Sequence, residues 1–362
     1  MRPVAPGPQS AEDAPMSSGF THQPGIEPLN PQRARELIAG ASGCCVLVLG
    51  DMVLDDHIIG GSRAVAREAP VPIIEMQSRY TVLGGATNVA ANLQALGCEV
   101  IAAGVIGNDS NAQTLREHLE TRAISSAGLV TDISRKTSVK LRVWASENRQ
   151  HSPRMMARID TVDRRDLDSP IANALTARLE QLLPQADVLL ISDYENGVVS
   201  TKVLSTALFL ARQHNLKVAV DAHGHLDRFR GVTIVTPNQP EAEAELDESL
   251  TSAASIRSAA SQLRKQLCAD GVVITLGAAG MVVASTEAEP LIIPAGPQTI
   301  VVDPTGAGDT VAAAVTVGLL AGGTFIESAQ LAELAARLVV RRLGVAVPEI
   351  PDVLAEAEQS HV

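Results

Sequence analysis

Hydrophobic residues along the chain gather in short runs of strand length, and stretches with helical character lie between many of them. The runs that predict strands are 44–51, 99–107, 187–194, 217–222, 232–238 and 271–277. Stretches typical of helices include 86–97, 109–123 and 251–267. Continuously apolar strands that alternate with helices are typical of a parallel sheet covered on both faces. The pattern therefore predicts an α/β fold.

Polar side chains stand at the carboxyl-terminal ends of four predicted strands, namely Asp51, Asp193, Asp221 and Asn238. Ligands of parallel α/β sheets bind at this edge of the sheet. We therefore expect a binding site where these strands end. For Asp51 and Asn238, the alternative is an ordinary turn residue that terminates a strand.

Two segments, about 53–78 and 137–160, break the alternation of strands and helices. In the second segment, apolar and polar or aromatic side chains alternate from residue to residue over 139–144. A period of two with one apolar and one polar face is typical of a half-exposed antiparallel ribbon. Ribbons inserted near the binding edge of an α/β sheet predict a lid. The alternative is an ordinary extension of the main sheet.

Composition narrows the classes of protein that fit. Of 362 residues, 46% are hydrophobic and 19% are charged, which is enough for a large buried core. The net charge of −12 disfavours a nucleic-acid-binding protein, although a small anionic ligand needs only a local basic pocket. Four cysteines without a CxxC pair favour buried free thiols over a structural zinc site. The longest apolar run, around 311–321, is too short to cross a bilayer.

The first 30 residues are rich in Pro, Gly and Ser and lack the pattern of a signal or transit peptide. They predict a disordered tail over 1–30. We expect one domain over 31–350, which includes both lid segments, and a C-terminal tail over 351–362. With no targeting pattern and no membrane span, the expected location is cytoplasmic.

The sequence "DPTGAGDT", residues 303–310, precedes a long apolar stretch typical of a helix. Gly306, Ala307 and Gly308 would let an anion approach the backbone at the unpaired N–H groups of the helix N-terminus. Asp309 would repel that anion, so its presence there suggests a proton acceptor. Phosphoryl transfer to a hydroxyl needs this combination of amides and a carboxylate. The alternative is a helix N-cap. Neither a Walker A motif nor a protein-kinase signature occurs.

Two motifs resemble those of the ribokinase-like (pfkB) carbohydrate kinases. "DPTGAGDT" is similar to their C-terminal signature, and "GGATNVAANLQALG", residues 84–97, is similar to their N-terminal glycine-rich motif. The resemblance extends from about residue 44 to residue 350. It implies a ribokinase-like three-layer sandwich with a mainly parallel central sheet and a small β-sheet lid. It also implies a carbohydrate kinase, a phosphotransferase with an alcohol group as acceptor, that uses ATP and Mg²⁺.

Further stretches resemble the D-glycero-β-D-manno-heptose-7-phosphate kinases of ADP-heptose synthesis, namely "GDMVLDDHIIGGSR", "EAPVPI", "VKLRVWA", "LISDY" and "FRGVTIVTPNQPEAE". This resemblance implies transfer of the ATP γ-phosphate to O1 of the heptose 7-phosphate, which gives the 1,7-bisphosphate. One alternative is a kinase of another sugar or nucleoside with the same fold. Another is a weakly catalytic protein that binds a sugar phosphate as a sensor.

The resemblance also implies a role for each residue at a matching position. Asp309 would be the general base, and the backbone of Gly306, Ala307 and Gly308 would form the anion hole. Substrate contacts fall on Asp51, Asp55, Gly84, Gly85 and Asn88. Nucleotide contacts fall on Asn238, Glu241, Thr275, Gly277 and Thr305. Glu241 is expected to hold Mg²⁺ through water, because that ion keeps much of its hydration shell.

A sugar phosphate also needs cations. We expect Arg63, Lys140 and Arg142 in the lid segments to clamp the phosphate distal to the reacting hydroxyl. The alternative is a set of solvated lid residues. Trp144, the only tryptophan, would either stack on the sugar or pack within the lid.

Three departures from the heptose kinase pattern affect positive charge. Asn196 in "DYENG" and His223 in "DAHG" stand where that subfamily has lysines. The segment "NRQHSPRMMARID" is longer than its counterpart and brings Arg149, Arg154 and Arg158. We expect these arginines to compensate, and the alternative is a pocket for a different sugar.

Two further features concern metals and partners. His223 and His225 form an HxH pattern, and without a third ligand we predict a polar loop there instead of a metal site. The resemblance to the carbohydrate kinases, whose ribbon lids often pair through their exposed strand edges, implies a possible homodimer through the lid. The expected small-molecule partners are a sugar phosphate and ATP, with no nucleic acid and no membrane.

Overall fold

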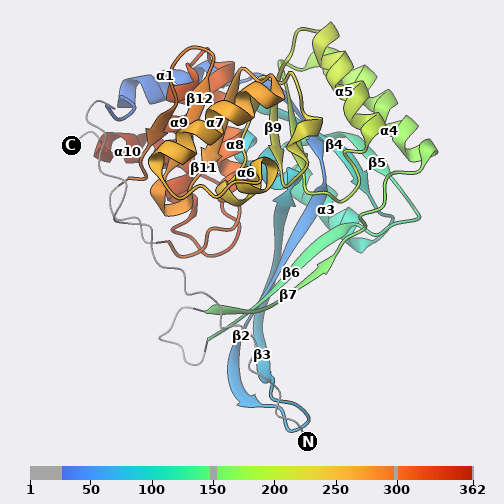
Figure 1. The fold of residues 1–362 in the computed structure, drawn as a ribbon. Coiled ribbons are helices and arrows are strands. Elements are labelled where there is room, and N and C mark those ends of the chain that lie inside the picture. Colours follow the sequence, from blue (N-terminus) through green and yellow to red (C-terminus); the bar gives the residue numbers. More distant parts are fainter. Residues whose placement is uncertain (1–26, 147–152, 297–300, 361–362) are drawn as a thin grey trace, which may run out of the picture.

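A central sheet lies between two layers of helices, and a second sheet projects from this body as an arm (Figure 1). The computed structural model describes residues 27–146, 153–296 and 301–360. Within those ranges the central sheet has the order β13-β12-β11-β10-β9-β8-β1-β4-β5. The strands are β1 (Cys45–Gly50), β4 (Glu99–Ile106), β5 (Ser125–Thr131), β8 (Val188–Asp193), β9 (Lys217–Ala222), β10 (Ile234–Val235), β11 (Gly271–Thr275), β12 (Met281–Ser285) and β13 (Leu291–Ile293).

Neighbouring strands are parallel from β5 to β11, and only the β11–β12 and β12–β13 pairs in this described sheet are antiparallel. The chain fills the sheet outward from β1 in both directions, so β1 and β8 flank a topological switch point. Ligands bind at such a point, beyond the carboxyl ends of the strands. The six apolar runs that predicted strands all form strands of this sheet.

Two apolar clusters join the helices to the two faces of the sheet. One cluster includes α1 (Pro31–Ala41), α2 (Ala86–Ala95), α3 (Ser110–Thr121), α8 (Ala307–Leu320), α9 (Phe325–Val339) and α10 (Ile350–Ser360). The other includes α4 (Ser169–Leu182), α5 (Thr201–Gln213), α6 (Gln239–Leu246) and α7 (Ala253–Leu267). Short 3-10 turns are η1 (Leu183–Gln185), η2 (Leu226–Arg228) and η3 (Gly277–Ala279). The predicted three-layer sandwich is confirmed.

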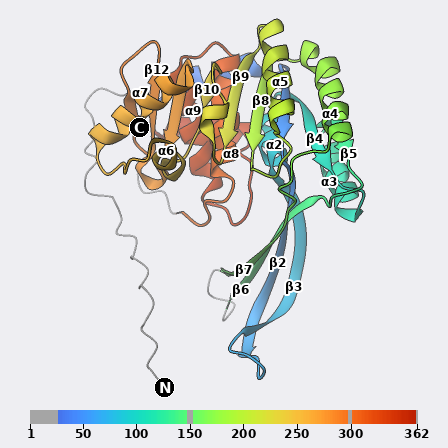
Figure 2. The same cartoon turned by 45° about the vertical axis from the view of Figure 1, so that its right-hand side comes forward.

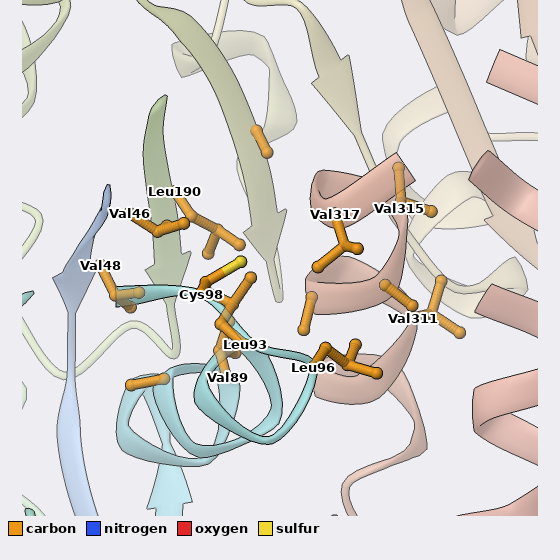
Figure 3. Close-up of a cluster of buried hydrophobic side chains, with 14 of the residues drawn as sticks. Val46, Val48, Val89, Leu93, Leu96, Cys98, Leu190, Val311, Val315 and Val317 are labelled. Atoms are coloured by element: carbon orange, nitrogen blue, oxygen red, sulfur yellow. The ribbon is translucent and has the colours of Figure 1, made fainter. Parts of the chain in front are cut away.

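Helices α2 and α8 pack together beneath the sheet, and their contact fixes two parts of the site. Val89 and Leu93 of α2 belong to the same buried cluster as Val311, Val315 and Val317 of α8 (Figure 3). Complete burial of such side chains stabilises the fold by about 1.5–3 kcal/mol each. Helix α8 is buried along most of its length, as its nearly unbroken apolar sequence predicts. The N-termini of both helices are therefore held in a fixed relation.

The lid is a separate sheet with the order β3-β2-β6-β7, and both views show it extending away from the body (Figures 1 and 2). Its strands are β2 (Met52–Val65), β3 (Pro72–Gly85), β6 (Ser138–Ser146) and β7 (Arg154–Thr161). Strands β2–β3 and β6–β7 pair antiparallel, whereas β2–β6 pair parallel. The lid is therefore not an extension of the central sheet. Its first ribbon is longer than predicted and continues to Gly85 at the start of α2.

The C-terminal tail predicted over 351–362 is wrong, because residues 350–360 form helix α10. Val353 and Ala357 are fully buried, and Glu356 accepts hydrogen bonds from Arg337 and Arg341. The spacing of apolar residues in this segment is that of an amphipathic helix. At the other end, α1 begins at Pro31, and residues 1–26 of the predicted N-terminal tail lie outside the described residues.

The prediction of buried thiols holds for only one of the four free cysteines. Cys98 is buried, and burial raises the pKa of its thiol to about 12. Cys268 is exposed, because it ends α7 in a left-handed conformation at a surface turn. Cys44 and Cys45 are half-buried. Across the described helices, none combines the length and hydrophobicity that a membrane crossing requires.

Candidate active site

The first turn of α8 brings Asp309 to the carboxyl-terminal edge of the sheet, where two neutral donors hold its buried carboxylate. Tyr194 Oη donates to Oδ1 at 2.7 Å, and Asn88 Nδ2 donates to Oδ2 at 2.6 Å. Burial raises the pKa of Asp309, while both hydrogen bonds and nearby His223 act in the opposite direction. A carboxylate has about four acceptor positions, so some remain for a substrate hydroxyl. Asp309 is not an N-cap, because Gly306 occupies that position.

A chain of side-chain amides fixes the orientation of Asn88. Thr310 Oγ1 donates to Asn92 Oδ1 at 2.8 Å, and Asn92 Nδ2 donates to Asn88 Oδ1 at 3.1 Å. All three side chains are buried between α2 and α8. The Asn88 side-chain oxygen already accepts a hydrogen bond from Asn92. The Asn88 side-chain nitrogen is therefore the atom that faces Asp309. Asn88, predicted to bind a sugar hydroxyl, therefore supports the carboxylate of Asp309.

The glycines before Asp309 leave the first turn of α8 open. Gly306 has a φ of 83°, and a Cβ there would lie 2.8 Å from Asn88 Nδ2. A larger residue would therefore strain the backbone and displace the Asn88 amide. At Gly308, in contrast, no heavy atom lies within 4 Å of an added Cβ. The Ala307 amide donates to the Pro304 carbonyl at 3.1 Å, whereas the backbone at Gly308 borders open space, as an anion seat requires.

Two adjoining cavities meet at this seat. The first measures about 510 Å³ and is lined largely by apolar or small residues, including Ala278, Met281, Ala295, Val301, Val311 and Val340. The second measures about 540 Å³ and has polar walls that include Tyr194, Asp221, His223, Asn238 and Asp309. Thr275, Gly277, Pro304 and Gly308 line both. An apolar cavity that leads past a helix N-terminus into a polar one suits a nucleoside and its phosphates.

His223 and Glu241 form a charged pair at the polar cavity, with 2.7 Å between Nδ1 and Oε1. Burial lowers the pKa of His223, but the hydrogen bond with Glu241 and the charges of Asp221 and Asp309 outweigh it and raise the pKa above its ordinary value. Asp221 itself is buried, and burial raises its pKa. The neighbouring carboxylates therefore favour the protonated, positively charged form of His223. The charge that we expected to be lost with the lysine is present in another form.

Asn238 and Glu241 also form the capping box that starts α6. Asn238 Oδ1 accepts from Glu241 N at 2.9 Å, and Glu241 Oε2 accepts from Asn238 N at 2.8 Å. An isolated parallel β-bridge pairs the backbone of Asn238 with that of Thr275 at the end of β11. Both residues line the polar cavity. Thr305 lies just before the anion seat, where its hydroxyl donates to Asp303 at 2.7 Å. The residues predicted to contact nucleotide therefore lie in one region.

The inner face of the lid brings further charged residues to the site. Arg142 Nη1 donates to Asp55 Oδ1 at 2.6 Å, and both side chains are buried. Lys140 Nζ lies 4.2 Å from the centre of the Tyr194 ring, and burial lowers its pKa. The polar face of β6 is thus turned toward the body. On the other face, the alternating apolar residues Leu141 and Val143 are only half-buried.

Gly84 and Gly85 make room for the protein's own groups at the base of the lid. A Cβ at Gly84 would lie 2.7 Å from the Asp55 carboxyl group. Gly85 has a φ of 52°, and a Cβ there would lie 2.9 Å from the Asp51 carbonyl oxygen. Their structural role here is to let Asp55 and the end of β1 approach β3, in contrast to the direct sugar contact that we expected.

Sequence comparison adds the deciding observation, because the profile of the pfkB family of carbohydrate kinases matches residues 46–352. The chain belongs to the pfkB family. This carbohydrate kinase is a phosphotransferase that acts on an alcohol group of a sugar, and kinases of this family use ATP.

Curated relatives carry the name bifunctional protein HldE. The protein from Trichlorobacter lovleyi is 35% identical over 334 residues, which are 92% of this chain and 67% of that protein. The protein from Caulobacter vibrioides is 37% identical over 308 residues, which are 84% and 62% of the two chains. The kinase thus spans only about 62–67% of the length of these relatives.

Solved structures share the fold at low identity. Phosphofructokinase-2 of Escherichia coli, in complex with substrates and products, has a TM-score of 0.73 at 19% identity and covers 88% of this kinase and 100% of its own chain. Ribokinase of Arabidopsis thaliana, complexed with ribose and ATP, has a TM-score of 0.67 at 19% identity and covers 88% and 99%.

Asp51 lies at the end of β1 but contacts backbone of the kinase, although we expected it to contact a sugar. Its Oδ2 accepts from Tyr194 N at 2.7 Å and from Asn196 N at 3.2 Å. Burial and the charge of Asp193 raise the pKa of Asp51 to about 6. Asp51 is therefore the residue that holds the loop after β8. Its other oxygen, Oδ1, is buried without a partner among the described residues, so the predicted contact with a sugar stays a prediction.

Arg63 differs from expectation, whereas Trp144 follows one of the two alternatives expected for it. Arg63 is exposed on the outer part of the lid and pairs with Glu75 at 3.1 Å, so it does not join the site. Trp144 is buried, and its Nε1 donates to His57 Nδ1 at 3.1 Å. His57 in turn stacks on Tyr80, with 4.9 Å between ring centres. Trp144 therefore packs within the lid.

The arginines expected to compensate for lost lysines do not do so where the structure describes them. Arg154 and Arg158 are exposed, and Arg158 pairs with Asp160 at 3.0 Å. Arg149 lies outside the described residues. Asn196 is buried, and its Nδ2 has no hydrogen-bond partner among the described residues.

Tyr194 and Asp303 are the site residues that sequence reasoning missed. Tyr194 is 115 residues from Asp309, and nothing local to either residue indicates their hydrogen bond. Asp303 holds Thr305 and also accepts from Gly344 N at 2.9 Å. Its place in "DPTGAGDT" was the available signal, since a buried carboxylate before a glycine turn is well suited to hold that turn.

Proposed function

We propose that this kinase transfers the γ-phosphate of ATP to O1 of D-glycero-β-D-manno-heptose 7-phosphate, giving the 1,7-bisphosphate. The observation that carries the proposal is the Asp309 carboxylate, which borders the α8 anion seat and the polar cavity. The choice of heptose is supported by the motif resemblance and by the relatives named bifunctional protein HldE. Because the kinase spans only part of those relatives, the proposal concerns the kinase reaction alone.

The two cavities support a defined orientation of ATP. The apolar cavity suits the base, and the polar cavity suits the phosphates. The amides at Ala307 and Gly308 and the imidazolium of His223 then stabilise negative charge that develops on the transferring phosphoryl group. Asn238, Thr275 and Gly277 line the path between the two ends.

The proton of the sugar hydroxyl passes to Asp309 as the oxygen attacks phosphorus. The carboxylate is ionised with help from its two hydrogen bonds, and it keeps acceptor positions for the incoming proton. On the lid side, Asp55 accepts sugar hydroxyls, while Lys140 and Arg142 supply positive charge for the sugar phosphate.

Magnesium fits this arrangement as an ion carried by the nucleotide. Mg²⁺ commonly takes one or two protein carboxylates and completes its shell with phosphates and water. Asp221 lines the polar cavity, and Glu241 lies beside it with oxygens that also bond Asn238 and His223. These two carboxylates would hold the ion through water. When bound, the ion neutralises phosphate charge.

A sugar-phosphate sensor without catalysis is the weaker alternative. A sensor has no need for a buried carboxylate at an anion seat, because the charge opposes phosphate binding. Here a tyrosine, an asparagine and the amide chain behind it all support that carboxylate. These supporting hydrogen bonds favour a catalytic base over a sensor.

The first test measures ADP release with Mg²⁺ and ATP over a panel of heptose 7-phosphate, fructose 6-phosphate, ribose and adenosine. We expect selective turnover of the heptose phosphate. Asp309→Asn should lower kcat by on the order of 10²–10⁴, the usual contribution of a positioned base. The matched control is Asp270→Asn, a change at the start of β11 away from the cavities.

Each outcome of the ADP-release test supports or contradicts a specific part of the proposal. Turnover of another compound in the panel would support kinase activity, and that compound would replace heptose 7-phosphate as the proposed substrate. Asp309→Asn activity within a few-fold of wild type would remove Asp309 from the role of base. ATP binding without turnover of any sugar would favour the sensor.

We also propose that the kinase forms a homodimer through its lid. Several large apolar side chains are exposed on the lid strands and the turn between them, namely Val65, Val71, Ile73, Met76, Met155, Met156 and Ile159. A second copy of the lid would cover such residues and pair its exposed strand edges.

A further inference from the structure

Tyr194 is placed where it can control the orientation of Asp309. Its backbone N–H donates to Asp51, which fixes the start of the loop after β8. The edge of the His223 ring packs against its ring at 4.1 Å between centres. Its hydroxyl reaches Asp309 Oδ1 at 2.7 Å, and Lys140 of the lid lies over its ring face. The ring is thus held on three sides, and its one polar atom is directed at the carboxylate.

We propose that Tyr194 is a positioning residue that holds one oxygen of Asp309 in place for proton transfer, and that Lys140 couples this hydrogen bond to the seating of the lid. The inference rests on the proposed role of Asp309 as the base. Tyr194 does not itself exchange a proton with the substrate in this scheme.

The chemistry of the pair explains why a tyrosine suits this position. The terminal torsion of an aspartate is soft, so one donor on each oxygen is needed to fix the plane of the carboxylate. Asn88 fixes Oδ2, and Tyr194 fixes Oδ1. Burial and the charge of Asp309 raise the pKa of the Tyr194 hydroxyl well above its ordinary value, so the phenol remains a donor. A neutral donor also leaves the carboxylate basic, whereas a bound cation would weaken it as a proton acceptor.

Several charged groups from neighbouring elements face Asp309 and set its proton affinity together with Tyr194. His223 after β9 lowers the pKa of Asp309, whereas Asp55 of β2 raises it. Asp221 of β9 and Lys140 of β6 are the other charged groups in reach. Within this set, the Tyr194 hydrogen bond favours the ionised carboxylate.

The contact of Lys140 with Tyr194 crosses from the lid to the body. A cation over an aromatic ring is attracted by the negative face of the ring. Lys140 lies on the same strand as Arg142, whose partner Asp55 is a proposed sugar contact. The contact and the Tyr194–Asp309 hydrogen bond are present together, so the lid strand that carries Lys140 and Arg142 is connected to Asp309 through the Tyr194 ring.

Tyr194→Phe tests the hydrogen bond alone, because the ring and its contact with Lys140 remain. With heptose 7-phosphate or the panel sugar that the kinase turns over, kcat should fall roughly tenfold while both KM values stay within about threefold. The acid limb of the kcat profile should move to higher pH, since loss of a donor raises the pKa of Asp309. A wild-type profile and kcat would overturn the proposal. Equal melting temperatures establish that the variant folds.

A second measurement needs no turnover. The chain has two tyrosines, so Tyr194→Phe identifies the phenolate absorbance change that belongs to Tyr194 when pH is raised. Asp309→Asn removes the adjacent charge and should let Tyr194 ionise at lower pH. If Asp309→Asn leaves that transition where it is, the hydrogen bond does not hold in solution and the proposal fails.

The lid coupling is tested by a double-mutant cycle of Tyr194→Leu and Lys140→Met on kcat/KM. Residues that act through one contact give non-additive losses, and additive losses would overturn the coupling. Asp309→Asn is measured in parallel. Survival of its activity would refute the base itself, whereas an inactive Asp309→Asn beside an unchanged Tyr194→Phe would refute only the role of Tyr194.

Discussion

Asp51 lies beneath the site and acts on it indirectly, through the loop that carries Tyr194. Burial is the main reason why its pKa is raised to about 6, and Asp193 adds a like charge nearby. Burial of this carboxylate is unfavourable, but the carboxylate accepts hydrogen bonds from two backbone N–H groups that would otherwise lack a partner. A change in the charge of Asp51 therefore alters the geometry of the base, while its second carboxylate oxygen has no partner among the described residues.

Asp51 should make the stability of the fold fall as pH rises. The folded chain holds this proton more tightly than the unfolded chain, so ionisation between about pH 4 and pH 6 opposes folding. The free energy of unfolding should therefore decrease over that range, and Asp51→Asn should reduce the decrease. Urea unfolding of both proteins at several pH values checks this. Asp221 also lowers the free energy of unfolding as pH rises, and it does so in both proteins. If the free energies of wild type and Asp51→Asn fall in parallel with pH, the decrease does not come from Asp51.

Sequence reasoning identified Asp309, its glycines and the nucleotide residues because each belongs to a local motif. It assigned Asp55 and Arg142 separately to the substrate, whereas the fold pairs them across β2 and β6. Tyr194 was missed for the same reason. A hydrogen bond between segments that are distant in sequence depends on how the elements pack, and a pattern within one segment does not contain that information.

At the scale of elements, strands and helices follow the hydrophobic period, and the last helix also has amphipathic spacing although we predicted a tail there. Helix α10 packs on the body through Val353 and Ala357, and its Glu356 pairs with Arg337. Arg337 of α9 bonds both Glu333 and Glu356, and Arg337 and Glu333 line the apolar cavity. The helix therefore supports the far wall of the proposed nucleotide site.

Glu356→Ala should destabilise the kinase by about 1–3 kcal/mol, because buried partners lose a charged hydrogen-bond acceptor. It should also weaken ATP binding, since Arg337 loses one of its two carboxylate partners and keeps only Glu333 and the Ser360 hydroxyl. Thermal unfolding and ATP titration measure the two effects. Glu358→Ala is the matched control on the same helix, where a surface pair with Arg35 at 3.7 Å should contribute under about 1 kcal/mol. Equal effects of the two changes would contradict the support role of α10.

At the scale of the whole molecule, the kinase divides into a closely packed body and an arm with exposed apolar residues. The proposed homodimer can be tested on that arm. Met76→Lys combined with Met155→Lys should shift the protein toward monomer in sedimentation velocity, because two charges would be buried in the interface. Phe209→Lys on α5 changes an equally exposed apolar residue of the body and should leave the oligomeric state unchanged. A wild-type protein that sediments as a monomer at all concentrations would refute the dimer.

The separation of body and arm has a consequence for how such an enzyme can diversify. The base, its supporting amides and the anion seat are anchored on α2 and α8 in the core. The residues proposed to contact the sugar lie on β2 and β6, whose inner ends pack into the same core through Met52, Leu54 and Val139 and whose outer parts extend into the arm (Figure 2). Substitutions on β2 and β6 can therefore redraw the acceptor preference while the phosphoryl-transfer machinery is inherited intact. A new acceptor specificity on this scaffold requires changes mainly in the small lid sheet. The sequence of the core can meanwhile stay conserved.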